Sequence, residues 1–245
     1  TVSNEITLGN TAVTKFRIPG INFVIKDTTA TDNYVLTVDS SGEAGWEPGG
    51  ATSINGLSDA KSIDQFSVGL GTNALANGAA VKYNTAVGQN AAYNNVNGTE
   101  NIYMGNNAGY TSTGNGNVFL GAGSGQRVTT GGSNTYVGKD AAKGDPFSAP
   151  TGSNNTAIGM ESLIAISGAA AQNTAIGKDA GRAVTTGSSN TFLGYDAGDA
   201  TTTSTNNTII GNGADASSAT VSNEITLGNA SIATLRCQVT SITAL

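Results

Sequence analysis

The sequence has 245 residues, a mass of 24.3 kDa and a net charge of −6. Four small residue types dominate it, with 34 Gly, 33 Ala, 33 Thr and 27 Asn, whereas charged residues make up only 11 %, against roughly 25 % in an ordinary soluble domain. With no histidine and one cysteine, Cys237, the chain excludes His-based catalysis, His-ligated metals, intrachain disulfides and Cys-rich metal sites. The acidic balance argues against nucleic acid or an anionic membrane as a partner, and no apolar run is long enough to predict membrane insertion.

The chain begins with a short module that it uses twice. Residues 1–10, TVSNEITLGN, recur identically at 220–229, and an alternating stretch follows each copy. Alternation predicts strands, so 1–20 is interpreted as an N-terminal β module that duplicates 220–239. Its first residues lack the basic and apolar regions of a secretion signal.

The next two segments differ from the rest of the chain. Turn-forming residues connect YVLTV to a piece that ends at Trp46, and the alternation on both sides predicts a small strand meander over 21–50. Trp46, the only tryptophan, is interpreted as the anchor of this meander rather than as a ligand contact. Residues 51–66 are predicted to form a linker or thin stalk.

Residues 67–230 consist of ten copies of one motif, Asn-Thr-x-aliphatic-Gly-x-x-Ala. The copies follow one another at intervals of 16 to 18 residues, with one interval of 21. A period of this length predicts a stacked repeat architecture. The motif glycines are Gly71, Gly88, Gly105, Gly121, Gly138, Gly159, Gly177, Gly194, Gly211 and Gly228, and the motif asparagines are Asn84, Asn101, Asn117, Asn134, Asn155, Asn173, Asn190 and Asn207.

Each copy combines a strand pattern with a turn. The segment Asn-Thr-x-aliphatic alternates with period two and is rich in β-branched residues, which predicts a short strand that the glycine ends. The connecting stretches are rich in turn-forming residues, and none has helical spacing. We therefore expect an all-β chain that folds as a β-solenoid or triple β-helix, with one or two strands in each repeat of ~17 residues.

The scarcity of large apolar side chains bears on the oligomeric state. Each copy offers one large aliphatic residue, such as Ile158 or Ile176, and a few small ones. At ~25 cal/mol per Å² of buried apolar area, these do not offset the ~1–2 kcal/mol of backbone entropy for each ordered residue. If three chains share an axis, each aliphatic side chain packs against its symmetry mates. The sequence thus favours an intertwined homotrimer.

One position between the threonine and the aliphatic residue admits two interpretations. It points to the opposite face from the aliphatic row, and in several copies it is aromatic. Packing in a second layer, under the connecting loops or between chains, is the favoured interpretation. The alternative is an exposed aromatic platform for stacking sugars, which would comprise Tyr103, Phe119, Tyr136 and Phe192.

The motif asparagines and the acids that follow the glycines invite a ligand or metal interpretation. Stacked solenoids commonly place asparagines in ladders whose amides satisfy buried backbone groups, and this structural role is favoured. The acids Asp140, Asp179 and Asp196 occupy one repeat position, which indicates a solvated corner rather than a cation site. No metal and no cofactor are predicted.

Residues 231–245 continue the alternation and are predicted to form a C-terminal strand segment. Cys237 lies in this register between Leu235 and Val239, so it is interpreted as a small buried hydrophobe rather than a nucleophile.

The repeat (NTAIGKDAG, SSNTFLGYDAG, NNTIIGNGA), the segment YVLTVDSSGEAGW and the ending NEITLGNASIATLRCQVTSITAL together resemble bacteriophage tail fibres and tailspikes. Specifically, they are similar to fibres that a C-terminal intramolecular chaperone of the endosialidase type matures. In that family a segment like TSITAL precedes the chaperone, which trimerises the fibre and then cuts itself off. The resemblance thus implies that Leu245 is the processing end.

The resemblance further implies an elongated homotrimer on a virion, outside the cell, with other tail proteins and a host surface glycan or protein receptor as partners. Some relatives carry polysaccharide-cleaving domains, but no pair of acids here stands in a distinctive setting for glycoside hydrolysis. We expect a structural and adhesive protein, not an enzyme.

Two alternatives remain open. The repeat is also similar to the heads of trimeric autotransporter adhesins of bacterial surfaces, which would continue into a coiled-coil stalk and a membrane β-barrel. The threonine content suggests an ice-binding β-solenoid, which needs a regular flat threonine array. The threonine runs at 111–113, 128–130, 184–186 and 201–203, however, are predicted to lie in loops of differing length.

Overall fold

The computed structural model describes residues 34–38, 44–48, 60–64, 66–78, 82–234 and 236. The chain divides into two units, residues 1–50 and 51–245. In the first unit, β1 (Tyr34–Val38) pairs with β2 (Ala44–Pro48) in antiparallel fashion, with Leu36 opposite Trp46. The predicted module 1–20 and the other parts of the predicted meander lie outside the described residues.

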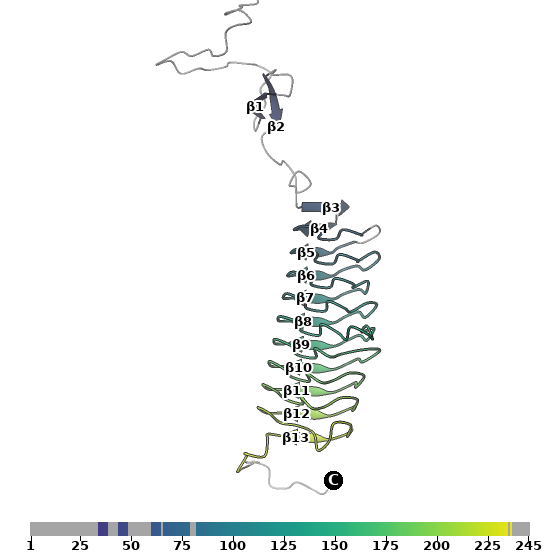
Figure 1. The fold of residues 1–245 in the computed structure, drawn as a ribbon, viewed down its shortest axis with the longest axis vertical. Helices are drawn as coiled ribbons and strands as arrows, with labels where there is room; N and C mark the ends of the chain where they lie inside the picture. Colours follow the sequence, from purple (N-terminus) through teal and green to yellow (C-terminus); the bar gives the residue numbers. More distant parts are fainter. Residues whose placement is uncertain are drawn as a thin grey trace, which may run out of the picture. The chain divides into compact units, whose positions relative to one another are not determined.

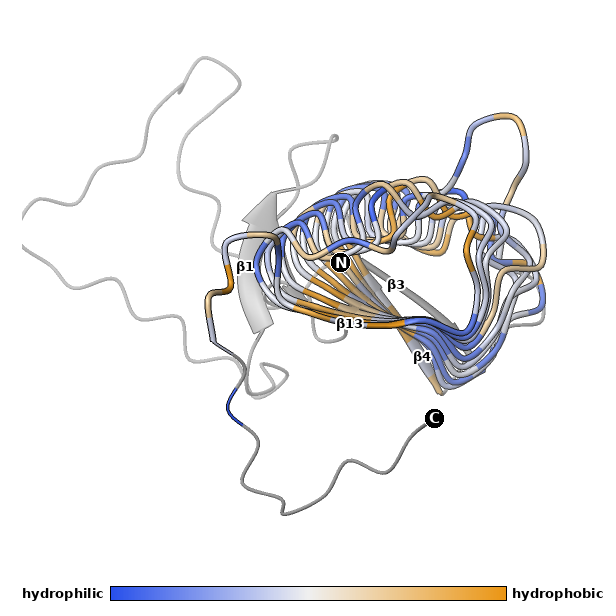
Figure 2. Cartoon of the chain, turned by 90° about the horizontal axis from the view of Figure 1, so that it is seen from below, coloured by the Kyte–Doolittle hydropathy of each residue, from blue (hydrophilic) through white to orange (hydrophobic). Residues whose placement is uncertain are grey.

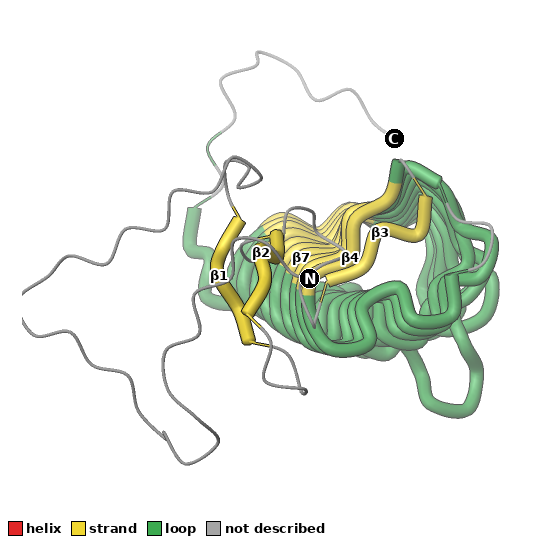
Figure 3. The backbone as a smooth tube through the Cα atoms, turned by 90° about the horizontal axis from the view of Figure 1, so that it is seen from above, coloured by secondary structure: helices red, strands yellow, loops and turns green. Residues whose placement is uncertain are grey.

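The second unit contains a β-solenoid of about nine turns (Figure 1). Ten parallel strands stack in sequence order, one from each coil, and the loops of each coil close the other sides (Figure 3). No helix occurs among the described residues. The parallel strands are β4 (Ser67–Leu70), β5 (Thr85–Val87), β6 (Ile102–Met104), β7 (Val118–Leu120), β8 (Thr135–Val137), β9 (Thr156–Ile158), β10 (Thr174–Ile176), β11 (Thr191–Leu193), β12 (Thr208–Ile210) and β13 (Ile225–Leu227).

The two ends of the repeat region differ from the sequence-based expectation. Part of the predicted linker forms a strand, β3 (Ala60–Asp64), which pairs antiparallel with β4 and covers the first edge of the sheet. The linker prediction is wrong for these residues, because the backbone groups of β4 need a partner at that edge. At the other end, residues 231–234 and 236 do not form the predicted strand. The remainder of that segment, including Cys237 and Leu245, lies outside the described residues.

The core lies inside each coil. The middle residue of every strand from β5 to β12 points inward and is fully buried. Large and small side chains compensate for one another across the interior: a Cβ on Gly198 would lie 2.2 Å from the ring of Phe192, and one on Gly109 would lie 2.2 Å from the ring of Tyr103. In the coil whose strand carries the small residue Ala157, the position that corresponds to Gly198 and Gly109 is occupied by the buried Leu163. In these coils, a large side chain on one side of the interior faces a small residue on the other, which keeps the interior closely packed.

The motif glycines form a column in which successive backbones touch. Gly177 has a φ of +136°, and a Cβ there would lie 2.2 Å from the carbonyl oxygen of Gly194 in the next coil. No side chain fits at that distance, and L-residues disfavour that φ. The glycine therefore does more than end the strand, because it lets consecutive coils stack at strand spacing.

The motif asparagines are fully buried and form a ladder along the stack. The side-chain nitrogen of Asn155 donates to the carbonyl oxygen of Ala170, across the same coil, at 3.0 Å. Its side-chain oxygen accepts the backbone N–H of Asn173 at 3.0 Å. The same two bonds recur in the other coils through Asn84, Asn101, Asn117, Asn134, Asn173, Asn190 and Asn207.

The ladder ends at a different residue. Glu224 takes the place of the motif asparagine, and its backbone N–H donates to the side-chain oxygen of Asn207 at 2.9 Å. Its carboxylate accepts hydrogen bonds from the backbone N–H and the hydroxyl of Ser217, which lower the pKa of the carboxyl group. A charged acceptor thus terminates the row of amides at the last coil.

Candidate interaction face

The outward side of the parallel strands forms one continuous surface, which we call the strand face. Each strand contributes its two outward residues, and the pairing register aligns them in two columns. Figure 2, a view along the stack, shows hydrophobic colour along this side of the coils. The first column is Val68, Thr85, Ile102, Val118, Thr135, Thr156, Thr174, Thr191, Thr208 and Ile225, and the second is Leu70, Val87, Met104, Leu120, Val137, Ile158, Ile176, Leu193, Ile210 and Leu227.

The strand face is uncharged, and its second column exposes aliphatic side chains in the single chain. Met104 retains 45 % of its surface, Leu193 retains 44 % and Ile176 retains 39 %. None of the residues in the two columns is charged. Ten strands at about 4.8 Å give a stripe of roughly 45 Å, whereas the surface of a monomeric soluble protein rarely exposes so long an apolar patch. Depletion of charge together with exposed aliphatic side chains is typical of the core of a protein–protein interface.

The first column contains a feature that the sequence reasoning missed. Five threonines stand in register on adjacent strands β8 to β12. The sequence-based argument against ice binding concerned the threonine runs of the loops, whereas the regular array of threonines lies in the motif itself. The signal was present in the sequence, because the residue after the motif asparagine is Thr in all five copies.

The exposed aromatic platform, the less favoured of the two interpretations of this position, is wrong. Tyr103, Phe119, Tyr136 and Phe192 are fully buried inside the coils, so they offer no surface to a sugar. Phe119 and Tyr136 stack on each other, with ring centroids 4.8 Å apart, and Tyr103 meets Phe119 edge to face at 5.5 Å. Because each coil has only one inward strand position, the largest side chains of the repeat fill the narrow interior.

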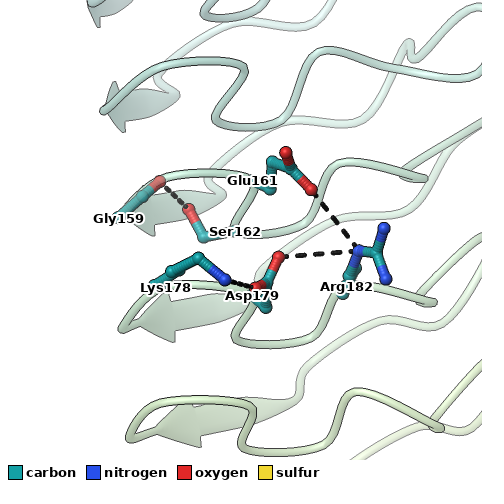
Figure 4. Close-up of polar contacts among 6 residues, drawn as sticks. All are labelled: Gly159, Glu161, Ser162, Lys178, Asp179 and Arg182. Carbon is teal, nitrogen blue, oxygen red and sulfur yellow. Dashed lines mark hydrogen bonds and ion pairs between the residues drawn. The ribbon is translucent and has the colours of Figure 1, made fainter.

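The solvated corner predicted at Asp140, Asp179 and Asp196 is wrong for Asp179, which is buried and belongs to an ion-pair network. Lys178 contacts its neighbour Asp179, and the Nε of Arg182 lies 3.5 Å from both Asp179 and Glu161, which belongs to the preceding coil (Figure 4). The hydrogen bond to Asp179 raises the pKa of the Lys178 ammonium group. In the described ranges, no group of three or more His, Cys, Asp or Glu side chains could hold a metal ion. The corner joins two coils through balanced charges.

The 21-residue interval produces the longest loop of the stack. Between Gly138 and Gly159, the carboxylate of Asp145 accepts the backbone N–H groups of Phe147 and Ser148 at 2.7 and 2.8 Å. The Phe147 ring is 97 % exposed. This loop thus presents a single exposed ring on a hydrogen-bonded turn.

No protein-family model, curated protein or solved structure matches this chain. No helix in the part of the chain that the structure describes is long and apolar enough to cross a membrane. The chemistry of the strand face itself, uncharged and aliphatic along one column, is what indicates a role for it.

Proposed function

We propose that this chain is a segment of a trimeric bacteriophage tail fibre that attaches the virion to a host cell. Three parallel copies pack through the strand face, around an axis that runs along the stack. The protein acts by shape and adhesion, and it does not catalyse a reaction. Its other partners are tail proteins and a host surface glycan or protein.

The observation that carries this proposal is the uncharged strand face over ten consecutive strands. Around a threefold axis, the column nearest the axis meets its own copies and the other column packs beside it, so a repeated face on one chain provides a continuous core for three. This arrangement offsets the shortage of large apolar residues within one coil. The buried interior and the strand face are then two separate packed layers.

The state of association tests the proposal. Light scattering at micromolar concentration should give a mass of three chains, near three times 24.3 kDa. A monomer with the far-ultraviolet circular dichroism of a β-solenoid would overturn the trimer.

Reading the gene beyond Leu245 tests the virion assignment. A chaperone segment supports a phage fibre, whereas a coiled-coil stalk and a membrane β-barrel support the adhesin head.

Ice binding is a second candidate, favoured by the threonine column. Thr135, Thr156, Thr174, Thr191 and Thr208 repeat at strand spacing, with an aliphatic column beside them. A regular array of hydroxyl and methyl groups of this kind can order water. It requires the face to be free, so a monomer that shows thermal hysteresis would support ice binding, and a trimer without hysteresis would exclude it.

A further inference from the structure

The two columns of the strand face differ in how they repeat. The second column is aliphatic on every strand from β4 to β13. The first column is apolar at Val68, Ile102, Val118 and Ile225, but threonine at β5 and from β8 to β12. One column is therefore almost uniform along the axis, and the other has a pattern.

This difference matters because a repetitive face does not define its own alignment. If one chain slides along the axis by one coil, every strand meets the next strand of its neighbours. Only the contacts of one terminal coil are lost if all coils are equivalent. A closed threefold assembly, by contrast, requires all three chains at the same height.

We propose that the first column lies nearest the threefold axis and sets the axial register of the three chains, while the second column adds apolar contact beside it. The inference rests on the trimer proposed above. With the first column nearest the axis, Ile102 meets Ile102 and Thr135 meets Thr135 when the chains are in register. After a slip of one coil, Ile102 meets Thr85, Val118 meets Thr135 and Ile225 meets Thr208. Each of these contacts places a hydroxyl group against a hydrocarbon side chain, which leaves the hydroxyl without a partner and the apolar packing incomplete.

The test uses a variant in which the first column is threonine on almost every strand. In the triple variant Ile102→Thr/Val118→Thr/Ile225→Thr, most of the pattern along the first column is lost. The control Val87→Thr/Val137→Thr/Ile210→Thr removes three aliphatic side chains from the second column and leaves the first unchanged. Both variants lower the apolar area of the face by similar amounts, so loss of area alone affects them alike.

Register is read by thiol cross-linking in a Cys237→Ser background. Chains that carry Thr174→Cys are co-expressed with chains that carry Thr191→Cys and oxidised mildly. Disulfides between like positions report aligned chains, and disulfides between position 174 and position 191 report a slip of one coil. The experiment is repeated with Ile176→Cys and Leu193→Cys, because only the column nearer the axis brings sulfur atoms within disulfide reach.

We expect the parent and the control to form disulfides between like positions almost exclusively. In the triple variant, the fraction of disulfides that join unlike positions, such as 174 and 191, should rise by about tenfold or more. This corresponds to about a tenfold change in the equilibrium between aligned and slipped chains. If the protein is a trimer and the triple variant stays aligned, the inference about register is overturned. The same holds if the control slips as much as the triple variant. Neither outcome contradicts the proposed trimer. A monomer by light scattering overturns the proposed trimer itself.

Discussion

The side-chain oxygen of Asn155 accepts a hydrogen bond from the backbone N–H of Asn173, 3.0 Å away and one coil further along the stack. The same amide donates to Ala170 across its own coil. One buried side chain thus joins neighbouring coils and closes its own coil, which explains why asparagine recurs in the motif.

Asn155→Ala should destabilise the solenoid by about 2–4 kcal/mol, because it leaves a buried N–H and a buried carbonyl group without partners. Chemical denaturation measures the change. Asn97→Ala, at an exposed loop position, is the control and should change stability by less than about 0.5 kcal/mol. Equal losses from the two variants would contradict the ladder's role.

Gly177→Ala should prevent stacking of two coils, since its Cβ would lie 2.2 Å from a backbone oxygen that cannot move aside. We expect the free energy of unfolding to fall by more than about 3 kcal/mol, or the variant not to fold. Gly168→Ala is the matched control: it also has a positive φ, +53°, but the nearest atom to its Cβ would be 3.9 Å away. The control should cost only about 1 kcal/mol. Thermal melts of both variants make the comparison.

The exchange of volume inside the coils predicts a rescue. Phe192→Ala should cost about 3–5 kcal/mol by opening a cavity. Adding Gly198→Leu should restore a large part of this loss, because it recreates the pairing of Ala157 with Leu163. Leu163 itself has a φ of +50°, so leucine is compatible with the backbone at that position. If the double variant is no more stable than Phe192→Ala, side-chain volume is not what couples the two positions.

The buried tyrosines predict a loss of stability in alkali. Burial raises the pKa of Tyr103 and Tyr136 above the ordinary value of 10.0. Above pH 10 the unfolded chain releases these protons while the folded chain retains them, so rising pH favours unfolding. In Tyr103→Phe/Tyr136→Phe, the midpoint of alkaline unfolding should move to higher pH, as followed by circular dichroism. Tyr195→Phe, at an exposed ring, should leave the midpoint unchanged.

Ile176→Asp places a charge in the middle of the strand face, where the proposed trimer buries the side chain. A buried unpaired carboxylate is costly, so the variant should dissociate into folded monomers. Light scattering measures the mass, and circular dichroism verifies the fold, because Ile176 points away from the interior of the coil. Thr186→Asp, at an exposed loop position, should remain trimeric. A trimeric Ile176→Asp protein would contradict packing through this face.

Much of the architecture follows from local pattern. The period of the motif, the alternation in Asn-Thr-x-aliphatic and the glycine after it specify a solenoid with one short strand per coil, because strand and turn propensities act within a few residues. The same alternation separates the inward position, as at Phe192, from the outward positions, as at Thr191 and Leu193. The sequence therefore determined which residues share a face.

Tertiary structure decided which face became the interior. Both faces of a strand such as TFL are apolar enough to be buried, and alternation does not say which one the loops of the same coil will cover. In the coil of Phe192, for example, the absence of a side chain at Gly198 leaves space for the ring on the inner side. The pattern of residues 60–64 does not by itself predict the edge strand β3. That strand forms by pairing with the backbone of β4, which would otherwise be unpaired at this edge of the sheet. Phe192 and Gly198 lie close together in the sequence, but their fit exists only once the coil has closed around its interior and its neighbours have stacked on it.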